Sequence, residues 1–147
     1  MIYLLDVNVL IALMDPIHVA HATAHSWFAL SVKEGWATCP TTENGFIRIV
    51  SNPKFQNPLG SPGAVAKIVA EFRNMDGHRF WPDDVSLSDS DLVRAEHLLS
   101  HSQVTDTYLL ALARRQGGQL ATFDRRLVTD SVVDGHNSLH LIEAKLQ

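Results

Sequence analysis

The chain has 147 residues, of which 46% are hydrophobic and 19% are charged, and its formal net charge is −4 with histidine neutral. These values predict one soluble domain covering residues 1–147, while the single cysteine, Cys39, excludes an intramolecular disulfide and fits a reducing compartment. The charge neither favours nor excludes a nucleic-acid partner, because the chain is neutral once four acids are assigned to a metal site.

The N-terminal sequence predicts a cytoplasmic protein. It has no basic segment, and Asp6 and Asn8 interrupt the apolar stretch that a signal peptide requires. The next apolar run, residues 9–14, is far shorter than the ~20 residues of a membrane-spanning helix. We therefore expect neither export nor a membrane partner.

Hydrophobic patterns along the chain predict short strands that alternate with helices. The first five residues form an apolar run typical of a strand covered on both faces, and Asp6 ends it. We expect strands at 1–5, 36–39, 78–81, 119–123 and 139–142, and helices at 8–14, 19–34, 41–50, 62–74, 88–100 and 105–116. This order predicts an α/β fold with a mostly parallel sheet of four to five strands and helices on both faces.

Capping residues and helix breakers indicate where these helices begin and end. Residues 52–60 contain two prolines and are expected to form a loop. Glycines after the helices 19–34 and 105–116 are expected to end them. The expected N-caps are Thr41 or Thr42 for the helix 41–50, Ser61 for the helix 62–74, and Ser88 or Asp89 for the helix 88–100.

Four acidic residues occupy positions that suggest a shared site. Asp6 and Asp124 each follow a predicted strand, and ligands of open α/β sheets collect beyond the carboxyl ends of the strands. Glu43 and Asp106 each lead the apolar stripe of a predicted helix, with apolar residues three, four and seven positions later. If the strands are parallel, all four carboxylates lie at one edge of the sheet.

Each acid taken singly has a structural explanation, because carboxylates are common at helix N-caps and in first helical turns. Four acids at one edge need a further explanation, because two unpaired carboxylates ~4 Å apart repel by about 4 kcal/mol at an effective dielectric constant of roughly 20. A bound cation would offset this repulsion. Oxygen ligands favour Mg²⁺ or Mn²⁺ over zinc, and these ions serve phosphodiester hydrolysis.

Four motifs in the chain resemble, in the same order, those of PIN-domain ribonucleases. They are Leu5-Asp6-Val7-Asn8-Val9-Leu10, Thr42-Glu43 ahead of Phe46-Ile47-Arg48, Thr105-Asp106 ahead of Leu109-Leu110-Ala111-Leu112-Ala113, and Ala121-Thr122-Phe123-Asp124. The likeness extends over nearly the whole chain. It is greatest to the VapC-type toxins of bacterial type II toxin–antitoxin pairs.

The resemblance implies a PIN-like three-layer α/β/α fold and an Mg²⁺- or Mn²⁺-dependent endoribonuclease. It further implies an RNA substrate, a homodimer, and a small VapB-type antitoxin that occupies the active-site groove. Carried over position by position, the catalytic residues and metal ligands are Asp6, Glu43, Asp106 and Asp124. Asn8 and Thr122 would hold the carboxylates or metal-bound water.

Arginines and histidines provide further candidates. The candidate substrate-binding residues are Arg114, Arg115, Arg125 and Arg126, although a solvated helix end also explains the first two. The histidines spaced as zinc ligands are His18, His21 and His25, together with His97 and His101. Neither group has a complete ligand set, so a packing or solvated role is favoured. Trp27, Trp36 and Trp81 lie in apolar patterns and are expected in the core rather than stacked on bases.

Other functions fit parts of the same pattern. A haloacid-dehalogenase-type phosphatase also has a strand that ends in aspartate, but it needs a second acid two residues later, where this chain has Asn8. A non-catalytic protein-binding module would use the acids structurally, and four ordered acids argue against it. An RNA-processing nuclease outside a toxin–antitoxin pair stays open, because PIN domains also occur in such proteins.

Overall fold

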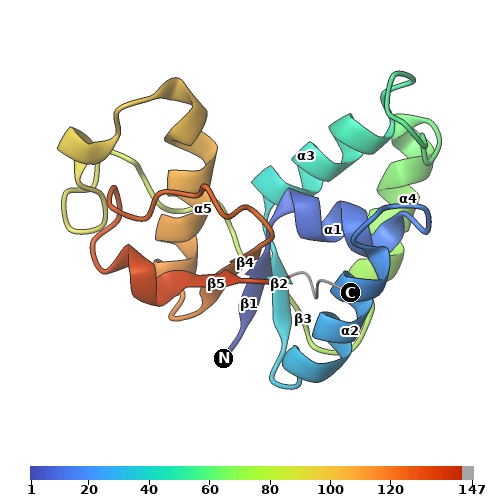
Figure 1. Ribbon diagram of the computed structural model, residues 1–147, viewed down its shortest axis with the longest axis horizontal. Coiled ribbons are helices and arrows are strands. Elements are labelled where there is room, and N and C mark those ends of the chain that lie inside the picture. The colour runs from blue at the N-terminus through green and yellow to red at the C-terminus, as the bar shows by residue number, and fades with distance from the viewer. Residues whose placement is uncertain (144–147) are drawn as a thin grey trace.

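Five short parallel strands form the central sheet of the computed structural model, which describes residues 1–143 (Figure 1). They are β1 (Tyr3–Leu5), β2 (Trp36–Thr38), β3 (His78–Phe80), β4 (Gln119–Thr122) and β5 (Leu139–Leu141). Their order in the sheet is β3-β2-β1-β4-β5, and every neighbouring pair is parallel. The predicted α/β class and strand set are confirmed, while the last four residues of the predicted domain 1–147 lie outside the described residues.

Helices cover both faces of this sheet. Those of the described chain are α1 (Val7–Met14), α2 (His21–Ser31), α3 (Pro40–Val50), α4 (Pro62–Arg73) and α5 (Val104–Arg115). Figure 1 shows α1 to α4 on one side of the sheet and α5 on the other. Because successive strand residues point to opposite faces, Leu5 packs with the first group while Leu4 packs against α5. The predicted three-layer α/β/α architecture is confirmed.

The predicted helix at residues 88–100 is wrong. This segment contains one turn of 3₁₀ helix, Ala95–His97, and Val93 forms an isolated antiparallel bridge with Val132. Leu92 and Val93 are buried in the cluster that packs against α5. Pairing with a distant segment therefore satisfies this backbone and buries its apolar residues, which outweighs a local capping signal of modest energy.

The N-terminus of α3 also differs from the prediction. Cys39 rather than Thr41 or Thr42 is its N-cap, and Pro40 is its first residue. The Thr42 hydroxyl accepts a hydrogen bond from the Cys39 backbone N–H at 3.0 Å. By contrast, the expected cap of α4 is confirmed, because the Ser61 hydroxyl accepts from the backbone of Ala64.

Within residues 1–143, no helix combines the length and apolar character needed to cross a bilayer.

Gly118 provides a test of the packing between α5 and the sheet. A Cβ at this position would overlap the backbone oxygen of Ile2 and lie 2.8 Å from the Trp81 ring. We expect Gly118→Ala to lower the free energy of unfolding in urea by about 1–3 kcal/mol, the usual cost of overpacking. Gly63→Ala, in the first turn of α4, places its Cβ in open space and should leave stability unchanged or raise it. Equal stability of the two variants would contradict this packing.

Candidate active site

Asp6 and Asp124 lie beyond the carboxyl ends of β1 and β4, which are neighbours in the sheet. Asp6 is also the N-cap of α1, because its Oδ1 accepts from the backbone N–H of Val7 at 2.8 Å. Asp6 therefore caps α1 and also lies at the edge of the sheet. Asp124 accepts through Oδ1 from the backbone N–H of Arg126, also at 2.8 Å.

The Thr122 hydroxyl joins the two strand ends. It donates to Oδ2 of Asp6 at 2.7 Å, and it accepts from Nδ2 of Asn8 at 3.2 Å and from the backbone N–H of Asp124 at 3.1 Å. A hydroxyl has one donor and two acceptor lone pairs, so all its hydrogen-bonding capacity is used. Thr122 therefore sets the orientation of Asp6, and Asn8 completes the arrangement from the first turn of α1.

Asp106, in the first turn of α5, faces the same two carboxylates. Burial, followed by the negative charges of Asp6 and Asp124, raises the pKa of Asp106 to about 6. Burial also raises the pKa of Asp6, against the hydrogen bonds from Thr122 and Val7 that lower it, and Asp124 adds a smaller upward shift. The structure thus brings these three aspartates close enough for their charges to interact, as the sequence predicts.

A cavity of about 280 Å³ opens beside this cluster. Its lining includes Asp106 and Asp124 together with Gln103 and Arg126. Two carboxylates and an exposed arginine in one lining suit a substrate that carries a phosphate next to a metal ion. We therefore regard this cavity as the candidate active-site cleft.

Glu43 is buried on the neighbouring side of the edge and has different partners. The Thr38 hydroxyl donates to Oε2 of Glu43 at 2.6 Å, and Nε of Arg73 lies 3.7 Å from the same oxygen. The charges that raise the pKa of Asp6 and Asp106 come from the aspartates rather than from Glu43. Glu43 is thus at the predicted edge but is paired with a cation, unlike the three aspartates.

His78 contacts the Thr38 hydroxyl that donates to Glu43. Its Nε2 lies 2.7 Å from Oγ1 of Thr38. Because the single Thr38 hydrogen points to Glu43, the imidazole must donate in this pair. Burial and then the charge of Arg73 lower the pKa of His78 to about 4, so the ring is neutral near pH 7.

Thr38, Arg73 and His78 are site residues that the sequence reasoning missed. A signal existed for Thr38, because it is the last residue of β2 as Thr122 is the last residue of β4. In both cases a threonine that ends a strand donates to a candidate acid: Thr38 to Glu43 on the following helix, and Thr122 to Asp6 at the end of the neighbouring strand. Arg73 and His78 carry no comparable signal, since their contacts with Thr38 and Glu43 depend on how α4 and β3 pack.

The four candidate arginines occupy two different places. Arg125 and Arg126 directly follow Asp124 and are exposed, and Arg126 lines the cleft. Arg114 and Arg115 lie at the other end of α5, about 12 Å along the axis from Asp106. There they face Asp134 and Asp89 at 3.6 and 4.0 Å. The structure therefore brings only the first pair to the carboxylates.

The histidines and tryptophans pack as expected. Nδ1 of His21 lies 2.7 Å from the carbonyl oxygen of Ala12, and Nε2 of His25 lies 2.9 Å from that of Leu13. These contacts satisfy carbonyl groups at the end of α1 that have no partner within the helix. Within the described residues Trp36 and Trp81 are buried and Trp27 packs against the core.

Cys39 is a buried thiol, and burial raises its pKa to about 11.

The donor set of the cluster fits a hard divalent cation. Asp6, Asp106 and Asp124 supply only oxygen atoms, and the pKa values of the first two are raised partly by like charges, which a cation would offset. Within residues 1–143, no three His, Cys, Asp or Glu side chains are already spaced to hold a metal ion.

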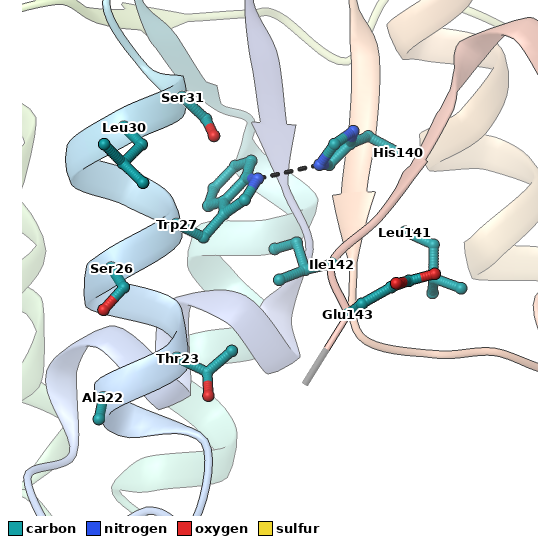
Figure 2. Close-up of a pocket in the computed structure, with 10 residues that line it drawn as sticks. All are labelled: Ala22, Thr23, Ser26, Trp27, Leu30, Ser31, His140, Leu141, Ile142 and Glu143. Carbon is teal, nitrogen blue, oxygen red and sulfur yellow. Dashed lines mark hydrogen bonds between the residues drawn. The ribbon is translucent and has the colours of Figure 1, made fainter. Parts of the chain in front are cut away.

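A larger cavity than this cleft contains none of the four acids. It has a volume of about 490 Å³ and lies between α2 and β5 (Figure 2). Its wall is mostly apolar, and the indole N–H of Trp27 donates to Nε2 of His140 at 2.9 Å. Size alone therefore does not locate the chemistry, which follows the carboxylates.

The family model described as PIN domain matches residues 3–129. The chain belongs to the PIN-domain family. Two curated relatives from Mycobacterium tuberculosis support this assignment. Ribonuclease VapC44 is 41% identical over 138 residues, covering 94% of this chain and 96% of the relative. Ribonuclease VapC39 is 46% identical over 124 residues, covering 84% and 89%. The predicted resemblance to VapC-type PIN domains is confirmed.

Solved structures show the same fold. The crystal structure of M. tuberculosis VapC20, described as a sarcin-ricin loop cleaving toxin, matches with a TM-score of 0.63 at 18% identity and covers 90% of this PIN-domain chain and 97% of that one. VapBC2 from Rickettsia felis, bound to a DNA fragment from its promoter, matches with a TM-score of 0.54 at 13% identity, covering 84% and 89%.

Asp106 provides a test of the cost of burying a charge beside like charges in the cluster. Its raised pKa in the folded state means that the fold loses stability as the pH rises from the unfolded value of 3.8 to about 6. In the presence of EDTA, Asp106→Asn should therefore be more stable than the wild type at pH 7, with a gain that vanishes below pH 4. For a half-exposed group we expect a gain on the order of 1 kcal/mol, or about 2–4 °C in Tm.

The matched control for this measurement is Asp76→Asn, an exposed aspartate outside the cluster. Its Tm should follow that of the wild type at every pH. A pH-independent difference between Asp106→Asn and the wild type would rule out the burial and repulsion of this charge as the source of the effect.

Proposed function

We propose that this protein is a divalent-metal-dependent endoribonuclease that acts as the toxin of a toxin–antitoxin pair. The observation that carries the proposal is that Asp106 and Asp124 line one cleft of a PIN domain and that their charges interact with each other and with that of Asp6. The relatives named ribonuclease VapC support an RNA substrate and hydrolysis of its phosphodiester bonds.

The proposed metal ligands and catalytic residues are Asp6, Glu43, Asp106 and Asp124. A Mg²⁺ or Mn²⁺ ion held by carboxylate oxygens supplies positive charge that orients water and stabilises the charge developing on the phosphodiester. Asp6, whose Oδ2 accepts from Thr122, would hold the ion together with Asp106 and Asp124, whose charges interact with it. Asn8 holds Thr122 in turn and so supports the same geometry.

Glu43 differs from the three aspartates in its surroundings. Its Oε2 accepts from Thr38 and lies near Arg73, so its charge is partly offset before any metal binds. We infer that Glu43 completes the ligand set from the side of β2 and that the neutral His78 ring keeps Thr38 oriented toward it. Arg125 and Arg126, exposed beside Asp124, are the proposed contacts to the RNA phosphates.

Cleavage of RNA by purified protein tests the catalytic proposal. With labelled total RNA, wild type should cut in Mg²⁺ or Mn²⁺ and not in EDTA, and Asp6→Asn and Asp106→Asn should lose at least a hundredfold in rate while keeping the fold by circular dichroism. Asp76→Asn should cut like the wild type. A folded wild-type protein that cuts no RNA with either metal would favour the non-catalytic binding module.

Induced expression in a bacterial host tests the toxin proposal. The structure of VapBC2 from R. felis supports a complex with a small VapB-type antitoxin, and we propose that this chain forms one and is a homodimer. Wild type should arrest growth, while Asp6→Asn expressed to the same level should not. Normal growth in the presence of an active nuclease would instead favour an RNA-processing role outside a toxin–antitoxin pair.

A further inference from the structure

A second cavity lies on the opposite side of the first turn of α5 from the active-site cleft. It has a volume of about 320 Å³, and its lining includes Thr41, Asp83, Val104 and Tyr108. The cleft is lined by Gln103 and Asp106 of the same turn. Since an α-helix with its side chains is about 10 Å across, the two cavities are separated by a distance that a single-stranded RNA can span with neighbouring nucleotides.

The lining of this second cavity combines apolar walls with one carboxylate. Val85, Leu87 and Val104 provide the apolar surface, and Asp83 provides the charge. The Thr41 hydroxyl donates to Oδ2 of Asp83 at 2.8 Å, which holds the carboxylate in place. A carboxylate has about four lone-pair positions, so Asp83 can accept further hydrogen bonds.

These features select the chemical class of the occupant. The described residues that line the cavity include no lysine or arginine, and the Asp83 carboxylate repels phosphate. A flat group with apolar faces and hydrogen-bond donors along one edge fits better. Single-stranded RNA is commonly recognised in this way, with the base held against an aromatic ring and bonded through its edge.

The hydroxyl of Tyr108 adds an independent observation. It is the one buried side-chain oxygen or nitrogen within residues 1–143 that has no hydrogen-bond partner. Burial, followed by a side-chain interaction with Asp83, raises the pKa of Tyr108, which places the hydroxyl beside that carboxylate in the same cavity. A buried polar group without a partner costs stability, and a ligand acceptor in the cavity would remove that cost.

We propose that this cavity binds a guanine base of the RNA, one or two nucleotides from the cleaved bond. Guanine presents two adjacent donors, N1–H and N2–H, which match the two oxygens of Asp83, and its O6 acceptor matches the Tyr108 hydroxyl. Adenine and cytosine each present an acceptor beside one donor, and uracil presents one donor between two acceptors. The inference rests on the proposed nuclease function, since it names part of that enzyme's substrate.

Sequencing of cut ends from a randomised single-stranded RNA pool provides the first test. Wild type with Mn²⁺ should cut RNA with guanine enriched at one fixed position near the cut. Asp83→Asn should reduce that enrichment by about tenfold or more, the discrimination typical of a bidentate base contact. Asp84→Asn, which removes the same charge from the next residue, should keep it. Cutting with no guanine preference, or a preference unchanged in Asp83→Asn, would overturn the proposal.

Inosine gives a sharper version of this test because it lacks only the N2 amino group of guanosine. In an oligonucleotide taken from the enriched pool, replacing that guanosine by inosine should lower kcat/KM of the wild type several-fold. The same replacement should have a smaller effect on Asp83→Asn, because that variant keeps only one of the two acceptor oxygens. Equal losses in both proteins would contradict a contact between Asp83 and N2.

Tyr108→Phe tests the second contact without endangering the fold, since the hydroxyl has no partner to lose. Its Tm should equal or exceed that of the wild type, while its guanine enrichment should fall. A Tyr108→Phe variant with unchanged enrichment would remove Tyr108 from the proposed subsite.

A binding measurement in EDTA separates this inference from the proposed nuclease activity. Guanosine 5′-monophosphate at millimolar concentration should shift the backbone amide signals of Thr105 and Tyr108 in ¹⁵N-labelled wild type, and cytidine 5′-monophosphate should not. Such shifts, lost in Asp83→Asn, from a protein that cuts no RNA would support the cavity and refute the nuclease. RNA cleavage without these shifts would refute the cavity and leave the nuclease proposal intact.

Discussion

The active-site edge depends on holding Asp6, Asp106 and Asp124 near one another although their charges repel. Burial and this repulsion raise the pKa values of Asp6 and Asp106, so the metal-free fold is less stable at neutral pH than the same fold with these groups neutral. The Thr122 hydroxyl opposes that effect through its short hydrogen bond to Asp6. Stability given up in this way is typical of sites whose charges serve a ligand rather than the fold.

The buried carboxylates on the two sides of this edge have different partners that stabilise their charge. On the side of β1 and β4, Thr122 orients Asp6, and among residues 1–143 no cation pairs with the aspartates. On the side of β2, Thr38 orients Glu43 and Arg73 lies close enough to offset its charge. A divalent cation is therefore attracted most strongly to the aspartate side, and Glu43 is positioned to contribute once the cation is there.

The first turn of α5 separates two cavities of different chemistry. One contains the carboxylates and Arg126, which suit a metal ion and a phosphate, and the other contains apolar walls, Asp83 and Tyr108, which suit a base. Both cavities are lined by this one helix, which residues such as Leu109 and Leu112 anchor in the core. The spacing between the two cavities is therefore rigid. A rigid spacing of this kind is what couples recognition of a base to cleavage at a defined bond.

Much of this molecule follows from the sequence by itself. Alternating apolar runs and helical stripes determine the strand set and the layers. Acids placed directly after strands must share an edge when the strands are parallel, which is why the positions of Asp6 and Asp124 were predictable. Asp106 was predictable because it leads the apolar stripe of its helix. Only the tertiary structure decided that residues 88–100 pair through Val93 rather than form a helix, that Glu43 faces Arg73, and that Arg114 and Arg115 lie away from the cleft. These features depend on contacts between segments far apart in the chain, whose energies exceed the local propensities that a sequence displays.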